Sequence, residues 1–216
     1  MTPDQINEIR VNPYKDDFPL LSRNADLAFL DSAATAQRPA CVLDAQRSFY
    51  ETMNANALRG LYRLSVEATQ AINDARHTVA SFIGASESQD IVFCRNTSEA
   101  LNIIAKSFGA SVLKPGDEVC ISIMEHHSNL IPWQQVCRAT GARLVYLRPD
   151  KQGIITAEEM DSKISQRTKI VSVTHVSNVL GIENPVVELG KRVHAVGGYL
   201  VVDGAQSVPH ISVDVK

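Results

Sequence analysis

The chain has 216 residues, a length that corresponds to one large domain or to one domain with a further part. Its 44% apolar and 21% charged residues are typical of an ordinary globular protein. The net charge is −3, from 21 basic and 24 acidic residues, which excludes a strongly basic nucleic-acid-binding protein and an acidic disordered tail. No apolar run approaches the ~18 residues that span a membrane, so no membrane association is expected.

The first half of the chain predicts two long helices. Residues 40–54 follow Pro39, which suits a first helical turn, and their apolar residues recur at helical spacing. A second helix is predicted from about residue 65 to residue 83, with Gly84 as its C-terminal cap.

From residue 91 onward, short apolar runs typical of buried strands alternate with helical patterns. The predicted strands are 91–94, 119–123, 144–147, 170–174 and 199–202. The predicted helices run through 100–108, from near Pro132 to Gly141, from a capping box at 156–159, and from Pro185 to the glycine pair at 197–198. This alternation predicts an α/β fold, with a mainly parallel sheet flanked by helices on both faces.

The four cysteines are predicted to be structural thiols. Cys41, Cys94, Cys120 and Cys137 form no C-x-x-C pair, and Cys94 and Cys120 lie within predicted buried strands. The polar, acidic residues 1–18 are not typical of a signal peptide. Together these features predict a reduced, cytoplasmic chain without a zinc site or another metal site.

Four polar segments follow predicted strands, at residues 95–99, 124–129, 175–178 and 203–207. In open α/β sheets, ligands bind at the carboxyl ends of the strands, so we expect these segments to form one composite site. Thr97 and Ser98 at a helix start suit a phosphate, although Ser and Thr there are more often simple caps. The adjacent His126 and His127 diverge in an extended loop. They are a poor chelating pair, but one of them could lie flat on a planar ligand.

The end of the last predicted strand carries the remaining candidate residues. A carboxylate at Asp203 is costly to bury unless it meets a positive group, and a pyridinium nitrogen is such a group. Asn178 and Gln206 are uncharged donors suited to a phenolate oxygen, although ordinary loop hydrogen bonds would also explain them. Phosphate donors, a stacking ring, a carboxylate and amides fit pyridoxal phosphate (PLP) better than a dinucleotide, because the chain has no G-x-G-x-x-G or Walker loop.

Several of these segments resemble a known family. The segments FLDSAAT (29–35), RNTSE (95–99), MEHHSN (124–129), THVSNVLG (174–181) and VDGAQ (202–206) occur in this order. They resemble the SUF-type (group II) cysteine desulfurases, which are class V aminotransferase-like enzymes of PLP fold type I. The resemblance implies an N-terminal segment, residues 1–35, followed by part of the PLP-binding large domain, residues 36–216.

The resemblance also implies the roles of individual residues. Thr97, with Ser98, would hold the phosphate, and His126 would stack on the pyridine ring in a catalytic position. Asp203 would pair with the ring nitrogen and Gln206 with the ring hydroxyl. Asn178 would lie beside the cofactor and the substrate carboxylate.

The sequence departs from the family pattern in two places. Leu58 and Tyr62 stand where the family often has histidines, which places substrate binding by that segment in question. The S-x-H-K segment, whose lysine forms the Schiff base, is absent, as are the persulfide cysteine and a substrate-binding arginine. We therefore expect an N-terminal fragment that is inactive by itself and associates through exposed apolar surfaces.

The implied parent enzyme removes sulfur from L-cysteine, leaving alanine and an enzyme persulfide. It passes the sulfur to an acceptor protein for iron–sulfur cluster assembly, acts on L-selenocysteine as an alternative substrate, and forms a homodimer. Two alternatives remain open at this point. The chain could belong to another fold-type-I PLP lyase or aminotransferase-like enzyme, or it could be a non-catalytic truncated product.

Overall fold

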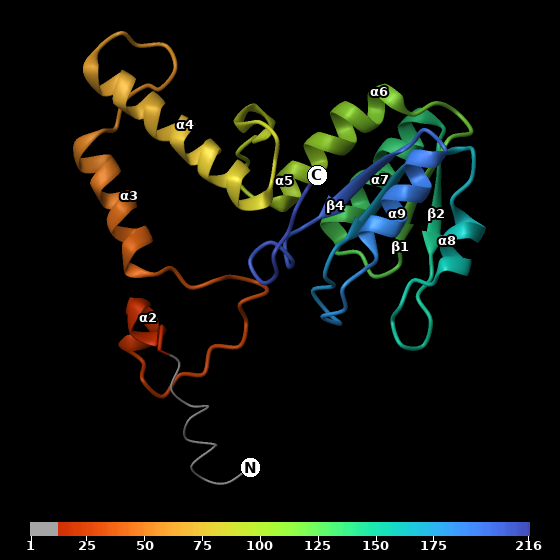
Figure 1. Ribbon diagram of the computed structural model, residues 1–216, viewed down its shortest axis with the longest axis horizontal. Helices are drawn as coiled ribbons and strands as arrows, with labels where there is room; N and C mark the ends of the chain where they lie inside the picture. The colour runs from red at the N-terminus through yellow and green to blue at the C-terminus, as the bar shows by residue number, and fades with distance from the viewer. Residues whose placement is uncertain (1–12) are drawn as a thin grey trace. The chain divides into compact units, whose positions relative to one another are not determined.

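The computed structural model describes residues 13–216 (Figure 1). Residues 1–12, which carry most of the stretch considered above for a signal peptide, lie outside the described residues. The described helices are α2 (Pro19–Ser22), α3 (Ala40–Thr52), α4 (Arg63–Ile83), α5 (Thr97–Ile103), α6 (Ala110–Val112), α7 (His127–Thr140), α8 (Ala157–Lys163) and α9 (Val186–Ala195). The described strands are β1 (Glu118–Ser122), β2 (Arg143–Leu147), β3 (Thr168–Thr174) and β4 (Tyr199–Asp203). Short 3-10 turns, η1 and η2, cover Lys15–Asp17 and Ser88–Asp90, and a π-helical segment, η3 (Ile104–Gly109), joins α5 to α6.

The chain divides into two compact units, Met1–Val79 and Ala80–Lys216. The two long helices predicted for the first half are confirmed as α3 and α4. Gly84 follows α4 with a φ of 72°, a left-handed conformation that a glycine adopts without strain, which agrees with its predicted cap role. None of the helices described in residues 13–216 has both the length and the apolar character needed to cross a membrane.

The second unit contains a four-stranded sheet in the order β2-β1-β3-β4. All three pairings are parallel. Cys120 of β1 stands opposite Val145 of β2 and Val171 of β3, and Val171 stands opposite Leu200 of β4. The predicted parallel α/β sheet is therefore confirmed, and β1 and β3 form its centre.

Helices cover both faces of the sheet because alternate strand residues point to opposite sides. On one face, Val119 and Ile121 of β1 pack in a buried cluster with Trp133 of α7. On the other face, Cys120 packs in a second cluster with Leu189 of α9. In Figure 1 the strands accordingly run between α7 and α9.

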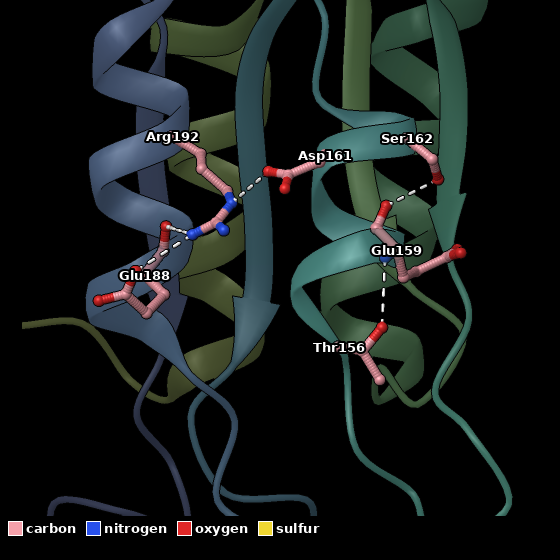
Figure 2. A network of polar contacts seen from close by, with 6 residues as sticks. All are labelled: Thr156, Glu159, Asp161, Ser162, Glu188 and Arg192. Carbon is pink, nitrogen blue, oxygen red and sulfur yellow. Dashed lines mark hydrogen bonds and ion pairs between the residues drawn. The ribbon is translucent and has the colours of Figure 1, made fainter.

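Polar contacts fix α8 against α9 on the second face (Figure 2). The Thr156 hydroxyl accepts the Glu159 backbone N–H at 3.3 Å, which confirms the predicted helix start. Arg192 of α9 donates from Nε to Asp161 of α8 at 2.7 Å and from Nη1 to Glu188 at 3.1 Å. Of these bonds, the one between Arg192 and Asp161 joins two helices that lie far apart in the sequence.

The strand predicted at 91–94 is wrong. This segment follows η2 and has no strand conformation, and Val92 and Phe93 are 75% and 52% exposed. Apolar composition alone does not make a strand, because a strand also needs a neighbour that accepts and donates its backbone hydrogen bonds. Within residues 13–216 no strand pairs with the segment. Cys94 is accordingly half-buried, whereas Cys120 is buried as predicted.

The helix predicted near Pro132 begins earlier, at His127. The His126 side chain accepts the backbone N–H of Ser128 at 3.1 Å and thereby caps the helix. Pro132 lies inside the helix near its start rather than opening it. The residues predicted as an extended loop after β1 are therefore partly the first turn of α7.

Candidate functional site

The carboxyl ends of β1, β3 and β4 lie at one edge of the sheet, because the three strands are parallel. The backbone N–H of His175, just after β3, donates to the carbonyl of Asp203 at the end of β4 at 2.9 Å. Glu125, which follows β1, accepts a hydrogen bond from the backbone of Thr174. Three of the four polar segments predicted from the sequence therefore meet at this edge.

The fourth polar segment opens α5. Asn96, rather than Thr97 or Ser98, is the N-cap, and its side-chain oxygen accepts the Glu99 backbone N–H at 2.9 Å. Among the described residues, the Thr97 hydroxyl takes part in no hydrogen bond. The capping role is thus filled by a neighbour, and the Thr97 hydroxyl is available to a ligand.

A chain of hydroxyl contacts joins α5 to the start of α7. The Ser98 and Ser128 hydroxyl oxygens lie 2.6 Å apart, and the Ser128 oxygen lies 2.9 Å from Nδ1 of His126. The rings of His126 and His127 are nearly perpendicular, with centroids 6.2 Å apart, so the two do not form a chelating pair. The structure therefore brings Ser98 and His126 together, through a residue that the sequence did not single out.

Glu125 and Asn129 form a polar network behind His126. The Ser122 hydroxyl donates to one carboxylate oxygen of Glu125, and the Asn129 amide donates to the other at 2.7 Å. The buried Asn129 also accepts from Trp133 Nε1 at 3.0 Å and from the Ser172 hydroxyl at 2.6 Å. Both residues lie in the MEHHSN segment, but only tertiary contacts show that they connect β1, α7 and β3.

Burial raises the pKa of the Glu125 carboxyl, and the nearby charge of Asp203 raises it further. The hydrogen bonds from Ser122, Asn129 and Thr174 act in the opposite direction without cancelling the effect. Burial therefore disfavours the ionised form of Glu125 more than it would for an exposed glutamate.

Asp203 is 5% exposed at the end of β4. Its Oδ1 accepts the Ala205 backbone N–H at 3.0 Å. Within residues 13–216, no lysine, arginine or histidine forms an ion pair with it. A buried carboxylate without a cation is costly, so this position suits a ligand that supplies a positive charge.

Asn178 and Gln206 line one open pocket of about 620 Å³ beside this edge. The pocket is also lined by Glu183 and His210, which the sequence did not indicate as site residues. Amide, carboxylate and imidazole groups thus surround one cavity. The structure brings Asn178 and Gln206 together here as a second group, separate from the hydroxyl chain at α5 and α7.

The two buried cysteines are poor nucleophiles. Burial, with the charges of Glu118 and Glu159, raises the pKa of Cys120 to about 12, and burial raises that of Cys137 to about 11. Both thiols stay protonated at neutral pH, and the thiolate is the reactive form. This agrees with the structural role predicted for them.

An open α/β protein with a ligand site at the carboxyl edge of its parallel strands is the class that this fold and site define. The family model that matches is that of class-V aminotransferases, over residues 28–216. The chain belongs to this family.

Individual relatives agree with this assignment. The chain is 46% identical over 202 residues to a probable cysteine desulfurase of Halalkalibacterium halodurans, covering 92% of this chain and 50% of that protein. The apo structure of a cysteine desulfurase from Thermococcus onnurineus matches with a TM-score of 0.87 and 38% identity, over 94% of this chain and 49% of the other. The structure of SspA in complex with cysteine matches with a TM-score of 0.80 and 26% identity, over 88% and 54% of the two chains. The chain thus spans about half the length of the relatives it matches.

Proposed function

We propose that this chain forms the cofactor-binding part of a PLP-dependent cysteine desulfurase. Relatives that bear this name are similar to nearly the whole chain, which itself spans about half of their length. The observation that carries the proposal is Asp203, a buried carboxylate without a cationic partner in the described part of the chain. A pyridinium nitrogen supplies the missing positive charge.

The donor set at the sheet edge fits PLP. The free Thr97 hydroxyl at the start of α5 suits the phosphate, which the helix N-terminus also favours. The exposed ring of His126 is available for stacking on a planar ligand. Gln206 suits the ring hydroxyl, and Asn178, in the same pocket, suits the substrate carboxylate.

In the proposed reaction these residues bind and orient the reactants. PLP, when bound, supplies an electron sink for electrons released at the substrate. Asp203 keeps a proton on the ring nitrogen, because its carboxylate gains a charge partner in this way. His126 holds the ring from one side, and Asn178 orients the substrate. The proposed substrate is L-cysteine, and the similar protein SspA has a structure in complex with cysteine.

Further details follow from the resemblance. We propose that the protein belongs to the SUF-type group, transfers sulfur to an acceptor protein for iron–sulfur cluster assembly, and accepts L-selenocysteine. The proposed enzyme is homodimeric and cytoplasmic. We also propose that residues 1–35 form an N-terminal segment and residues 36–216 a PLP-binding region. The high pKa values of Cys120 and Cys137 support a persulfide cysteine other than these two.

A PLP titration of the purified chain tests the cofactor assignment. We expect saturable binding, measured by calorimetry and by circular dichroism in the cofactor absorption band. Asp203→Asn is expected to weaken binding about tenfold or more, a loss of about 1.4 kcal/mol, because the nitrogen loses its charge partner.

Asp161→Asn is the matched control. It removes a carboxylate on α8 whose side chain is 65% exposed. This control is expected to bind PLP like the parent. Equal affinities of all three proteins, or no saturable binding by the parent, would contradict the proposal.

A further inference from the structure

Ser128 is the central member of a hydroxyl–imidazole chain at the edge of the sheet. Its oxygen lies 2.6 Å from the Ser98 oxygen and 2.9 Å from Nδ1 of His126. Ser98 lies in the first turn of α5, thirty positions before Ser128 in the sequence, whereas Ser128 and His126 lie at the start of α7. The contact therefore couples two helix starts.

The backbone shows which nitrogen of His126 carries the proton. The Ser128 backbone N–H lies 3.1 Å from Nδ1, and an amide N–H can only donate. Nδ1 must then accept, so the neutral ring carries its proton on Nε2. A histidine whose Nδ1 was protonated would place two N–H groups against each other.

The same argument gives the direction of the whole chain. The Ser128 hydroxyl faces the same unprotonated Nδ1, so the hydroxyl and the backbone N–H of Ser128 share its one lone pair as donors. Its own oxygen is then the acceptor for the Ser98 hydroxyl at 2.6 Å. The hydrogen bonds therefore run from Ser98 to Ser128 to His126.

Neighbouring groups do not supply an alternative partner for His126. The His127 ring stands at 85° to the His126 ring, with 6.2 Å between centroids. The Glu125 carboxylate is bound by Ser122, Asn129 and the Thr174 backbone. Within residues 13–216, the two hydrogen bonds to the His126 ring thus both come from Ser128.

We propose that Ser128 is a positioning residue that holds His126 as the neutral tautomer with its proton on Nε2. This inference rests on the proposed function for its consequence, which concerns the stacking histidine. A ring fixed at Nδ1 presents one defined orientation to a planar ligand and keeps its single proton at Nε2. The Ser98 hydroxyl donates to Ser128, so Thr97 is the remaining hydroxyl at this helix start that can donate to an anionic group.

Nitrogen-15 NMR of the full chain tests this arrangement without any ligand. In the parent protein we expect Nε2 of His126 to be protonated and Nδ1 to be unprotonated with the upfield displacement of a hydrogen-bonded acceptor. In Ser128→Ala the Nδ1 resonance is expected to move downfield, because the hydroxyl donor is lost. Ser128→Thr keeps a hydroxyl and is expected to restore the parent position.

The remaining variants distinguish the hydroxyl chain from a general structural effect. Ser98→Ala is expected to shift Nδ1 in the same direction by a smaller amount, because it removes the donor to Ser128. Ser162→Ala is the control, since that hydroxyl donates to the Glu159 carbonyl on α8 and lies outside the chain. It is expected to leave the His126 nitrogens unchanged.

A protonated Nδ1 in the parent, or an unshifted Nδ1 in Ser128→Ala, would overturn the inference. The PLP titration reports separately on the proposed function. Failure of PLP binding with the expected nitrogen shifts would reject the cofactor assignment alone. PLP binding with a protonated Nδ1 would reject the role of Ser128 alone.

Discussion

The two ends of the parallel sheet provide different partners for their carboxyl groups. At the amino end, the 3% exposed Glu118 is matched by two arginines, with Arg143 Nη2 at 2.8 Å and Arg167 Nη2 at 3.1 Å from its Oε1. Its second oxygen accepts the Ser165 hydroxyl at 2.8 Å. At the carboxyl end, Glu125 and Asp203 meet neutral donors, and no cation in residues 13–216 forms an ion pair with either.

The pKa values follow this difference. Burial alone would raise the pKa of Glu118, but the hydrogen bonds from Ser165 and Arg143 and the charges of both arginines lower it overall. For Glu125, burial dominates and the pKa is raised. At the amino end of the sheet, the buried carboxylate is therefore paired with cations from the same chain. At the carboxyl end, a carboxylate would be stabilised by a cationic ligand. That asymmetry distinguishes a structural ion cluster from the proposed cofactor site.

The largest expected loss of stability is at Asn129, which takes part in three hydrogen bonds at the carboxyl end. Asn129→Ala removes the hydrogen-bond partner of the buried Trp133 Nε1–H and of the buried Ser172 hydroxyl. It also removes one of the hydrogen bonds to Glu125, which keeps those from Ser122 and Thr174. We expect a loss of about 3 kcal/mol or more in the free energy of unfolding, measured by urea denaturation.

The control for this variant is Asn102→Ala. Asn102 donates to the Ser98 carbonyl within α5, so its loss is expected to change stability by about 0.5 kcal/mol or less. Equal losses for the two variants would show that the network around Asn129 does not stabilise the carboxyl end.

The second prediction concerns the ion cluster at the amino end. Glu118→Gln is expected to cost about 2 kcal/mol at pH 7, because a buried charge-assisted hydrogen-bond set is weakened. Since the pKa of Glu118 is lowered on folding, its stabilisation is complete above the ordinary value of 4.5 and is lost as the pH falls through the lower, folded value. The difference in the free energy of unfolding between Glu118→Gln and the parent is therefore expected to become smaller in acid.

Asp161→Asn provides the comparison for Glu118. The Asp161 side chain, which pairs with Arg192 (Figure 2), is 65% exposed, and the loss of this pair is expected to cost about 0.5 kcal/mol. Urea denaturation of both variants at several pH values measures the two effects. A gap at Glu118 that widens in acid would mean that the arginines do not lower its pKa.

The third and smallest change in the free energy of unfolding is expected at Glu125, and its dependence on pH is opposite to that at Glu118. Its raised pKa means that the folded protein loses stability as the pH rises from 4.5 through the folded value, because the unfolded chain ionises first. Glu125→Gln removes this loss, so relative to the parent it is expected to gain about 1 kcal/mol between pH 4.5 and neutral pH.

Thermal or urea unfolding of Glu125→Gln and the parent over this pH range checks the prediction. The Glu118→Gln series serves as the internal reference, since its sign is reversed. If the parent instead gained stability over Glu125→Gln with rising pH, the two ends of the sheet would behave alike and the comparison would fail.

Local patterns in the sequence determined much of the fold. The apolar runs at 119–123, 144–147, 170–174 and 199–202 became the four parallel strands, because each is short, β-branched and separated from the next by a helical segment. The capping signal at Thr156 and the position of Asp203 at a strand end were also local, and both are confirmed in the structure. The resemblance of the motifs to a class V aminotransferase-like family is confirmed by the family match.

Tertiary structure alone decided the remaining features, because each depends on partners distant in the sequence. The segment 91–94 has the composition of a strand, yet strand formation requires a paired neighbour, and within the described chain it has none. Glu118 and Asp203 are both carboxylates next to an apolar run in the sequence. Only the fold places Arg143 and Arg167 beside Glu118. Within residues 13–216 it places no cation in an ion pair with Asp203. Composition sets which residues can be buried, whereas the charges that meet them there are set by how distant segments come together.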